Sequence, residues 1–159
     1  MSVRRHPLTP GDPRDPHDAL IRSLPLDEAL ADRLATSAHR CGPPGERLAP
    51  RFYERLFARA PELRAMFPKD MQQQSEKMGA TLAFVVQQLR SPEALRVPLQ
   101  ELGARHKEYG AKREHYVIVV EELVGAMADV AGPSWTEDDT ADWALALRLV
   151  SDQMLGPRS

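Results

Sequence analysis

The sequence predicts an all-α fold. Apolar residues recur at intervals of three and four along most of the chain, which is the period of a helix that buries one face. The alternation of apolar and polar residues that is typical of strands is almost absent. Prolines and glycines divide the chain into segments of helical length. At 159 residues, the chain favours a single domain that is large enough to enclose a ligand pocket.

The first two helices are expected on either side of Gly42-Pro43-Pro44, because this sequence ends a helix. Each helix carries one apolar stripe of helical period. The stripe before the break is Leu30, Leu34, Ala38 and Cys41, and the stripe after it is Leu48, Phe52, Tyr53, Leu56 and Phe57. Pro61 then stops or kinks the chain, and Phe67-Pro68 marks a corner.

Two helices are expected in the middle of the chain. The first carries the stripe Met71, Met78, Leu82, Val85, Val86 and Leu89. Ser91-Pro92-Glu93 is typical of a helix start, with serine at the cap and proline in the first turn. Pro98 interrupts this region because it lacks a backbone donor. We therefore expect a short broken turn there and then a helix from Pro98 to Tyr109.

Two further helices complete the chain. Val117-Ile118-Val119-Val120 is β-branched and on its own would suit a strand. The apolar pattern continues at helical period through Leu123, Val124, Met127 and Val130, so its length favours a helix. Thr136 and Asp139 resemble a capping box with aspartate in place of glutamate. The stripe that follows is Trp143, Leu147, Val150 and Met154.

Residues 1–24 form a segment of different composition. Pro7, Pro10, Pro13 and Pro16 recur every three residues among charged and polar neighbours, and each removes a backbone donor. We expect a disordered or extended arm. The alternative is a polyproline ligand for a partner protein.

The composition excludes several classes of partner. The chain has 21 Lys+Arg and 23 Asp+Glu, a balance that argues against nucleic acid binding. No apolar run approaches the roughly 20 residues that cross a bilayer, which argues against a membrane protein. Prolines and acids follow Arg4 and Arg5, where a signal peptide would be apolar. Cys41 is the only cysteine, which excludes an intramolecular disulfide. We expect a cytoplasmic protein.

Two stretches carry a resemblance to a known family. Residues 51–68, RFYERLFARAPELRAMFP, resemble the B helix, C helix and following corner of bacterial single-domain globins and of the globin domains of flavohaemoglobins. Residues 101–123, ELGARHKEYGAKREHYVIVVEEL, resemble their F and G helices. The likeness extends from about residue 27 to 154. It implies a globin fold, a three-over-three helical sandwich around a haem pocket, in a domain of residues 25–159.

Several spacings within this resemblance hold together. Pro61 lies six residues before Phe67, and Tyr53 lies fourteen before it. Gln74 lies thirty-two residues before His106, which lies ten before Tyr116. Each spacing alone is weak evidence for a haem site, because a lone helical histidine or tyrosine is more often an ordinary surface or core residue. Together they match the haem site of the family.

The resemblance implies haem b, iron protoporphyrin IX, with His106 as the axial ligand of the iron. Leu99 and Leu102 precede His106 by seven and four residues, so they share its helix face and are expected against the same side of the haem. Tyr116 matches the tyrosine that polarises this histidine. The other four histidines are weaker candidates for the iron ligand; they are His6, His17, His39 and His115.

On the opposite side of the haem, the resemblance implies that Tyr53 and Gln74 face the bound gas. A phenol and an amide both donate hydrogen bonds, and such donors favour O₂ over neutral CO. The alternative is that Tyr53 fills the core and Gln74 is solvated, since Gln72 and Gln73 are adjacent. Four further cofactor contacts are expected: Phe67 stacked on the porphyrin, Lys77 at a propionate, and Met78 and Leu82 along the haem plane.

The chain departs from the family in two respects. The glutamate that completes the histidine–tyrosine interaction would fall near Arg158, where no acid is present, so we expect weaker polarisation of His106. The sequence also ends without the flavin- and nicotinamide-binding modules of flavohaemoglobins. Turnover of nitric oxide is therefore expected only with an external reductase.

Three functions remain as hypotheses. The first is a haem globin that reversibly binds O₂, NO or CO, for oxygen transport or storage, with nitric oxide detoxification when a reductase supplies electrons. The second is an electron-transfer or gas- and redox-sensing globin in which Lys77 or Met78 occupies the sixth site of the iron. The third is a globin-like interaction module without haem. The sequence is compatible with a monomer and with a homodimer through the last two helices.

Overall fold

The computed structural model describes residues 28–91 and 93–156. Within these ranges the chain forms helices and helical turns and contains no strand, which confirms the all-α prediction. The predicted arm, residues 1–24, lies outside the described residues, and so does Arg158. None of the described helices is both long and apolar enough to cross a membrane.

Six long helices make up most of the structure. They are α2 (Glu28–Arg40), α3 (Ala49–Arg59), α4 (Gln72–Gln87), α5 (Glu93–Glu108), α6 (Arg113–Ala131) and α7 (Glu137–Leu155). Three short elements connect them: a π-helix η1 (Pro44–Leu48) and two 3₁₀-helices, η2 (Pro61–Met66) and η3 (Gly132–Ser134). The breaks follow the predicted prolines, because Pro44 opens η1 and Pro61 opens η2.

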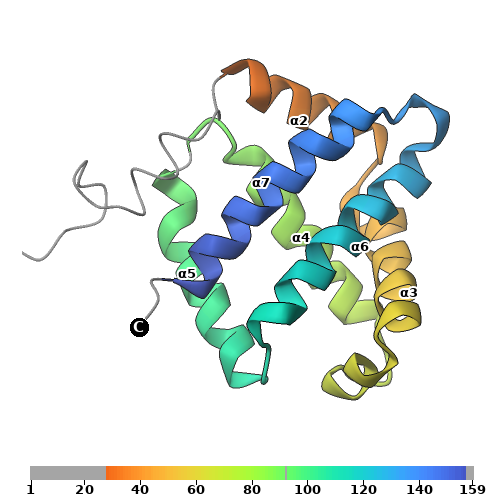
Figure 1. The fold of residues 1–159 in the computed structure, drawn as a ribbon, viewed down its shortest axis with the longest axis vertical. Helices are drawn as coiled ribbons and strands as arrows, with labels where there is room; N and C mark the ends of the chain where they lie inside the picture. The colour runs from red at the N-terminus through yellow and green to blue at the C-terminus, as the bar shows by residue number, and fades with distance from the viewer. Residues whose placement is uncertain (1–27, 92, 157–159) are drawn as a thin grey trace, which may run out of the picture.

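The long helices form two layers of three. Helices α3, α6 and α7 form one layer, in which α6 packs on both α3 and α7. Helices α2, α4 and α5 form the other, with α2 packed on α4. The layers meet where α2 and α5 lie on α7 and where α4 lies on α3. Figure 1 shows α7 crossing the front of the molecule beside α6, with α4 behind them. The predicted three-over-three arrangement is therefore present.

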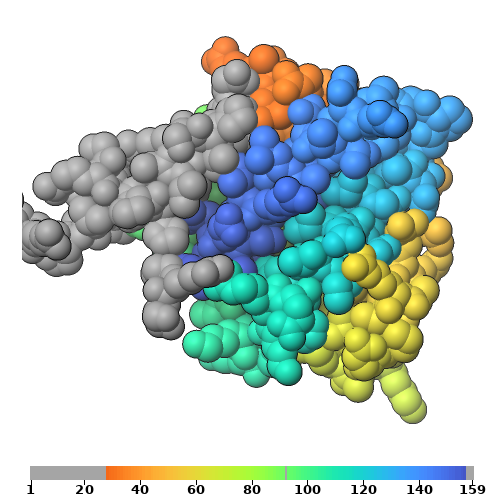
Figure 2. Space-filling model, viewed as in Figure 1, coloured from red at the N-terminus to blue at the C-terminus, as the bar shows by residue number. Residues whose placement is uncertain are grey.

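The core lies between the layers and is closed by the last helix. Trp143 of α7 is 1% exposed, and its indole Nε1 donates to Ser37 Oγ of α2 at 2.8 Å. This bond satisfies a buried donor that would otherwise oppose burial of the ring. In the space-filling view, α6 and α7 lie against each other along this face (Figure 2).

The prediction that Pro98 breaks the chain is wrong, because α5 continues through it from Glu93. Pro98 lies in the second turn, where its missing N–H would have bonded to the carbonyl of Ala94. Both residues are exposed, so water can satisfy that carbonyl. The fixed φ of proline is itself helical, and the helix therefore tolerates the loss of one bond.

The predicted capping box at the start of α7 is confirmed. Thr136 Oγ1 accepts from the backbone N–H of Asp139 at 3.1 Å, and the carboxylate of Asp139 accepts from the N–H of Thr136 at 3.0 Å. Arg40, at the end of α2, donates to the same carboxylate at 2.9 Å and also to the carbonyl of Ser134. Asp139 thus joins the end of α2 to the start of α7.

Protonation of Asp139 is expected to lower the stability of the fold at acid pH. Burial raises the pKa of its carboxyl, but hydrogen bonds from Thr136 and Arg40 outweigh this effect, and the pKa lies below its usual value. A lowered folded-state pKa gives stability that is present above about pH 4 and is lost as the pH falls through that pKa. We expect Asp139→Asn to lower the free energy of unfolding by about 1 kcal/mol at pH 7 and by less at about pH 3. Urea unfolding at both pH values measures the difference, and an equal loss at both would contradict the linkage.

Candidate functional site

Two polar side chains that the sequence places twenty-one residues apart meet between α3 and α4. Gln74 Nε2 donates to the hydroxyl oxygen of Tyr53 at 3.1 Å. Tyr53 lies in the middle of α3 and is 6% exposed, while Gln74 lies in the first turn of α4 and is half-buried. Of the three adjacent glutamines, Gln72 and Gln73 are exposed. The structure therefore brings together the two residues predicted to face the gas.

The Tyr53 hydroxyl keeps its own proton as a donor. Burial raises the pKa of the phenol, and the hydrogen bond from Gln74 lowers it by less, so the net pKa lies above the usual value. The group is therefore a neutral O–H at pH 7. Because the Gln74 amide donates to its oxygen, the phenolic hydrogen is free to point at a third group.

An aromatic cluster surrounds this pair. The ring centroid of Tyr53 lies 5.9 Å from that of Phe57 and 5.5 Å from that of Phe67, and the Phe57 and Phe67 centroids are 5.4 Å apart. The contacts of Phe67 with the other two rings are edge-to-face, which is a favoured arrangement of aromatic pairs. Phe67 is half-buried, so one part of its ring remains available to another flat group.

Arg64 holds the corner that carries Phe67, a role that was not predicted from the sequence. Its guanidinium lies over the Phe57 ring, 5.4 Å from the centroid. It also donates to the backbone carbonyls of Phe67 at 3.3 Å, Pro68 at 2.8 Å and Lys69 at 2.9 Å. The available signal was an arginine three residues before Phe-Pro, since a long donor at that distance can reach the carbonyls of the following turn.

The face of α4 that continues from Gln74 is apolar. Met78 and Leu82 follow at four-residue intervals, so the three side chains share one face. Leu82 is buried and Met78 is half-buried against the core. The side chain of Lys77 is exposed and makes no ion pair or hydrogen bond with any of the described residues. The predicted position of Lys77 at a propionate therefore stays a prediction.

His106 is half-buried near the end of α5 with a fixed imidazole. Its Nδ1 lies 2.8 Å from the backbone carbonyl of Leu102, one turn earlier. A carbonyl only accepts, so Nδ1 carries the proton and Nε2 keeps its lone pair. The Tyr116 ring of α6 lies with its centroid 6.3 Å from that of His106, and burial raises the pKa of its phenol. The structure thus brings His106, Leu102 and Tyr116 together as a second group.

The turn after His106 is closely hydrogen-bonded. Gly110 adopts a φ of 91°, the N–H of Gly110 donates to the carbonyl of Lys107 at 3.0 Å, and that of Ala111 donates to the carbonyl of His106 at 2.9 Å. These two bonds form a Schellman motif, in which glycine is favoured at the left-handed position. His115 Nδ1 then accepts from the N–H of Lys112 at 3.0 Å. His115 therefore shapes the corner between α5 and α6.

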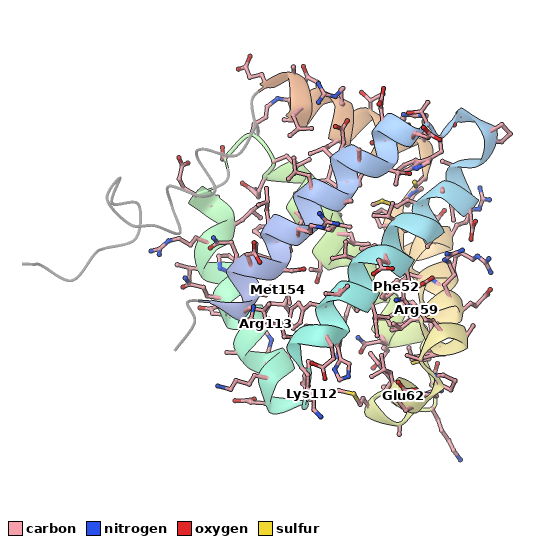
Figure 3. All side chains as sticks on the ribbon, viewed as in Figure 1. Phe52, Arg59, Glu62, Lys112, Arg113 and Met154 are labelled. Atoms are coloured by element: carbon pink, nitrogen blue, oxygen red, sulfur yellow. The ribbon has the colours of Figure 1, made fainter. Side chains whose placement is uncertain are left out.

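Gly103 determines how closely α5 approaches the end of α7. A Cβ atom at this position would overlap the carbonyl oxygen of Met154 and would lie 2.5 Å from its carbonyl carbon. Figure 3 shows Met154 near the end of α7, where this helix reaches the other layer. Gly103 lies about one turn before His106, so this close backbone contact with α7 is next to the imidazole along α5.

Gly103→Ala is expected to lower the free energy of unfolding by about 1–3 kcal/mol, although alanine favours helix by about 1 kcal/mol. The obstructing atoms belong to the backbone of Met154, so no rotamer change relieves the overlap. Gly125→Ala is the matched control, because the three atoms nearest to its Cβ all belong to the guanidinium end of the Arg55 side chain, with Cζ at 2.6 Å. Urea unfolding of the two variants measures the difference. Equal effects at both sites would contradict this role of Gly103.

One buried amide near this contact was not predicted. Gln153 of α7 is 3% exposed, and its Oε1 has no hydrogen-bond partner among the described residues. The predicted apolar stripe contained Val150 and Met154 and did not include Gln153. No sequence signal distinguishes a buried glutamine of a helix from a solvated one.

By their chemistry, the residues of the two groups suit a planar apolar cofactor that brings its own metal ligands. His106 offers one ring nitrogen, Nε2, opposite the nitrogen that faces the Leu102 carbonyl, and a histidine nitrogen is the axial ligand of haem iron in globins. The described residues contain no cluster of three or more His, Cys, Asp or Glu side chains that could hold an ion, so a metal at His106 would need further ligands from a cofactor. The side chains of Phe67, Met78, Leu82 and Leu102 are apolar and suit the faces of a porphyrin.

Comparison with known proteins places these residues in a family context. A family model described as Globin matches residues 50–154. The flavohemoprotein of Bordetella pertussis is 30% identical over 115 residues, which cover 70% of this chain and 29% of that protein. The flavohemoprotein of Bacillus subtilis is 31% identical over 115 residues, with the same two coverages. That of Rhizobium meliloti is 27% identical over 137 residues, covering 84% of this chain and 34% of that protein. The chain thus spans about a third of these relatives or less.

A solved structure supports the fold. An engineered carbene transferase, described as a putative nitric oxide dioxygenase from Rhodothermus marinus, superposes with a TM-score of 0.70. The match covers 79% of this chain and 87% of that one at 24% sequence identity. At this level of identity the likeness concerns the arrangement of helices.

Proposed function

The chain belongs to the globin family and has the globin fold, and from this premise we propose that it binds one haem b and reversibly binds O₂ and other diatomic gases. The observation that carries the proposal is the hydrogen bond of 3.1 Å between Gln74 and Tyr53. It leaves a neutral phenol O–H as a free donor beside an aromatic cluster. A buried donor in apolar surroundings suits a small ligand that gains negative charge when it binds.

His106 is the residue we assign as the iron ligand, through Nε2. The carbonyl of Leu102 holds the opposite nitrogen and thereby fixes both the tautomer and the orientation of the ring. Tyr116 lies beside the ring, and the side chains of Phe67, Met78, Leu82 and Leu102 would contact the porphyrin. When bound, the haem supplies an iron atom that binds O₂, NO or CO reversibly.

Tyr53 and Gln74 are assigned to the side where the gas binds. The phenol donates its hydrogen to the ligand, and the amide holds the phenol oxygen in place. Such donors favour ligands that carry partial negative charge, so we expect slower release of O₂ than in a globin with an apolar gas-binding side.

The relatives are named flavohemoproteins, and one structural neighbour is described as a putative nitric oxide dioxygenase. For this chain we propose nitric oxide conversion only together with a reductase, because each turnover consumes electrons that no described residue supplies. The cytoplasmic location and the choice between monomer and homodimer stay predictions.

Absorption spectra of the purified protein with one equivalent of hemin test the proposal. We expect a Soret band in the ferric form, a five-coordinate ferrous form and a distinct complex with CO. A six-coordinate low-spin ferrous form would instead favour the sensing or electron-transfer function, with Met78 as the first candidate for the sixth ligand because it is half-buried on the face of Gln74. Absence of a Soret band would overturn the haem proposal itself.

A further inference from the structure

The turn between α5 and α6 presents a surface that the gas-binding function does not use. We define the corner surface as Arg105, Lys107, Tyr109, Lys112, Arg113 and Val117, all of which are exposed. Arg105 and Tyr109 lie one turn apart along α5 and its end, and Arg113 and Val117 lie one turn apart on α6. Each helix therefore contributes a cation next to an apolar or aromatic side chain. Figure 3 shows Lys112 at the lower edge of the molecule, where the two helices join.

Four cations of the corner surface lack an acidic partner among the described residues. They are Arg105, Lys107, Lys112 and Arg113. Arginines on α3 behave differently. They form a ladder of ion pairs with α6, in which Arg51 pairs with Asp129 at 2.9 Å, Arg55 with Glu122 at 3.0 Å and Arg59 with Glu121 at 2.9 Å. The chain thus pairs the α3 cations with acids on one side of α6, whereas the four corner cations have no acidic partner among residues 28–91 and 93–156. Two exposed acids, Glu108 and Glu114, lie in the same stretch of chain, so the cations there outnumber the acids by four to two.

The corner surface also exposes the two most accessible large apolar or aromatic side chains of the described residues. Tyr109 is 70% exposed and Val117 is 56% exposed. Tyrosine is enriched in protein interfaces because it gives contact area at a low cost in side-chain entropy. Exposed aromatic and β-branched side chains are not expected on a surface whose charged groups only contact water. Their presence among these cations therefore favours a binding surface.

The backbone beneath this surface is already ordered. The Schellman motif at Gly110 and the bond from Lys112 to His115 fix the turn from both sides. A surface that is held in place loses less conformational freedom on binding. The corner also lies directly after His106, so a protein that binds there comes close to the helix that carries the proposed iron ligand.

We propose that the corner surface is the docking site of an acidic electron-donor protein. The inference rests on the proposed haem site. The donor, a flavoprotein or iron–sulfur protein with an acidic patch around its redox centre, would give up one electron, and a haem iron held by His106 would accept it; no atoms would be transferred. The carboxylates of the donor would pair with the four cations of the corner surface, and Tyr109 and Val117 would provide the apolar contact.

Two variants test the proposal on the full chain. The corner variant combines Lys112→Glu and Arg113→Glu. The control variant combines Arg47→Glu and Arg148→Glu, two exposed cations on other elements for which the structure gives no ion pair. Flavodoxin, a small acidic flavoprotein, serves as the probe, and its binding to each ¹⁵N-labelled variant is followed by amide shifts at 20 and 200 mM salt.

The expected result is a weakening of flavodoxin binding by about tenfold in the corner variant at low salt, with shifts that centre on the corner in the parent. The control variant should change by less than about twofold. In haem-loaded protein, reduction by reduced flavodoxin should slow by about tenfold in the corner variant, while reduction by dithionite is unchanged. Equal losses in both variants, or salt-independent binding, would overturn the proposal.

Two further outcomes are separable. If the parent takes up no haem, the haem proposal fails, and the binding titration alone still decides whether acidic proteins dock at the corner. Vesicles of phosphatidylglycerol form the second arm. If they shift the corner resonances and flavodoxin does not, the surface binds lipid and the protein-docking proposal is wrong.

Discussion

Replacing His106 with alanine is expected to abolish stoichiometric haem uptake. The imidazole is the one group of the candidate site with a nitrogen whose lone pair is free, because Leu102 holds its Nδ1 proton. The described residues contain no cluster of His, Cys, Asp or Glu that could hold the metal instead. Titration with hemin, followed at the Soret band, measures the loss. Addition of free imidazole should restore part of the band, because it can replace the missing ligand in the space left by the side chain.

The fold itself should survive this change. His106 is half-buried, and the helix around it is held by the Schellman motif and by the contact of Gly103 with α7. We expect the unfolding free energy of the haem-free protein to change by less than about 1 kcal/mol. His39→Ala, at an exposed position of α2, is the control and should bind haem as the parent does. If the His106 variant binds hemin one to one with an unchanged spectrum, another ligand must be sought.

The sequence was most informative where the period of a single helix determines which side chains share a face. Gln74, Met78 and Leu82 follow one another at four-residue intervals, so any helix must place them on one face, and the structure does so. The same holds for Leu102 and His106, which are one turn apart and joined by a hydrogen bond. The approach of Tyr53 to Gln74 across two helices came instead from the family resemblance, since periodicity within a helix says nothing of its neighbour.

Features that depend on packing between distant segments were not predictable. The overlap that a side chain at Gly103 would make with Met154 joins residues fifty-one apart and leaves no trace in local composition. Pro98 was misread because a proline has the same sequence signature whether it ends a helix or lies near its exposed start. Arg64 differs from these, because its three carbonyl acceptors lie only three to five residues along the chain and its spacing from Phe-Pro was a usable signal.

Replacing Tyr53 with phenylalanine is expected to speed the dissociation of O₂ by about ten- to a hundredfold. The variant keeps the ring and its contacts with Phe57 and Phe67 and removes only the hydroxyl. A hydrogen bond to a charged acceptor contributes about 1.5–3 kcal/mol, and each 1.4 kcal/mol is about a factor of ten. Stopped-flow measurement of O₂ release gives the rate. CO is neutral and gains little from the donor, so its release should change by less than about threefold.

Gln74→Leu shows whether the two side chains act as one unit. The amide donates to the phenol oxygen at 3.1 Å, so its removal leaves the Tyr53 hydroxyl free to rotate away from the gas. If Gln74 acts only by holding Tyr53, the double variant will release O₂ no faster than Tyr53→Phe alone, and the two effects will not add. If Gln74 donates directly to the gas, its effect will persist in the Tyr53→Phe background. Tyr109→Phe is the control, because that phenol is 70% exposed and lies on the corner surface, outside the candidate haem site. A rate of O₂ release that is unchanged in both Tyr53→Phe and Gln74→Leu would remove the pair from the gas-binding side and leave their hydrogen bond as a contact between α3 and α4.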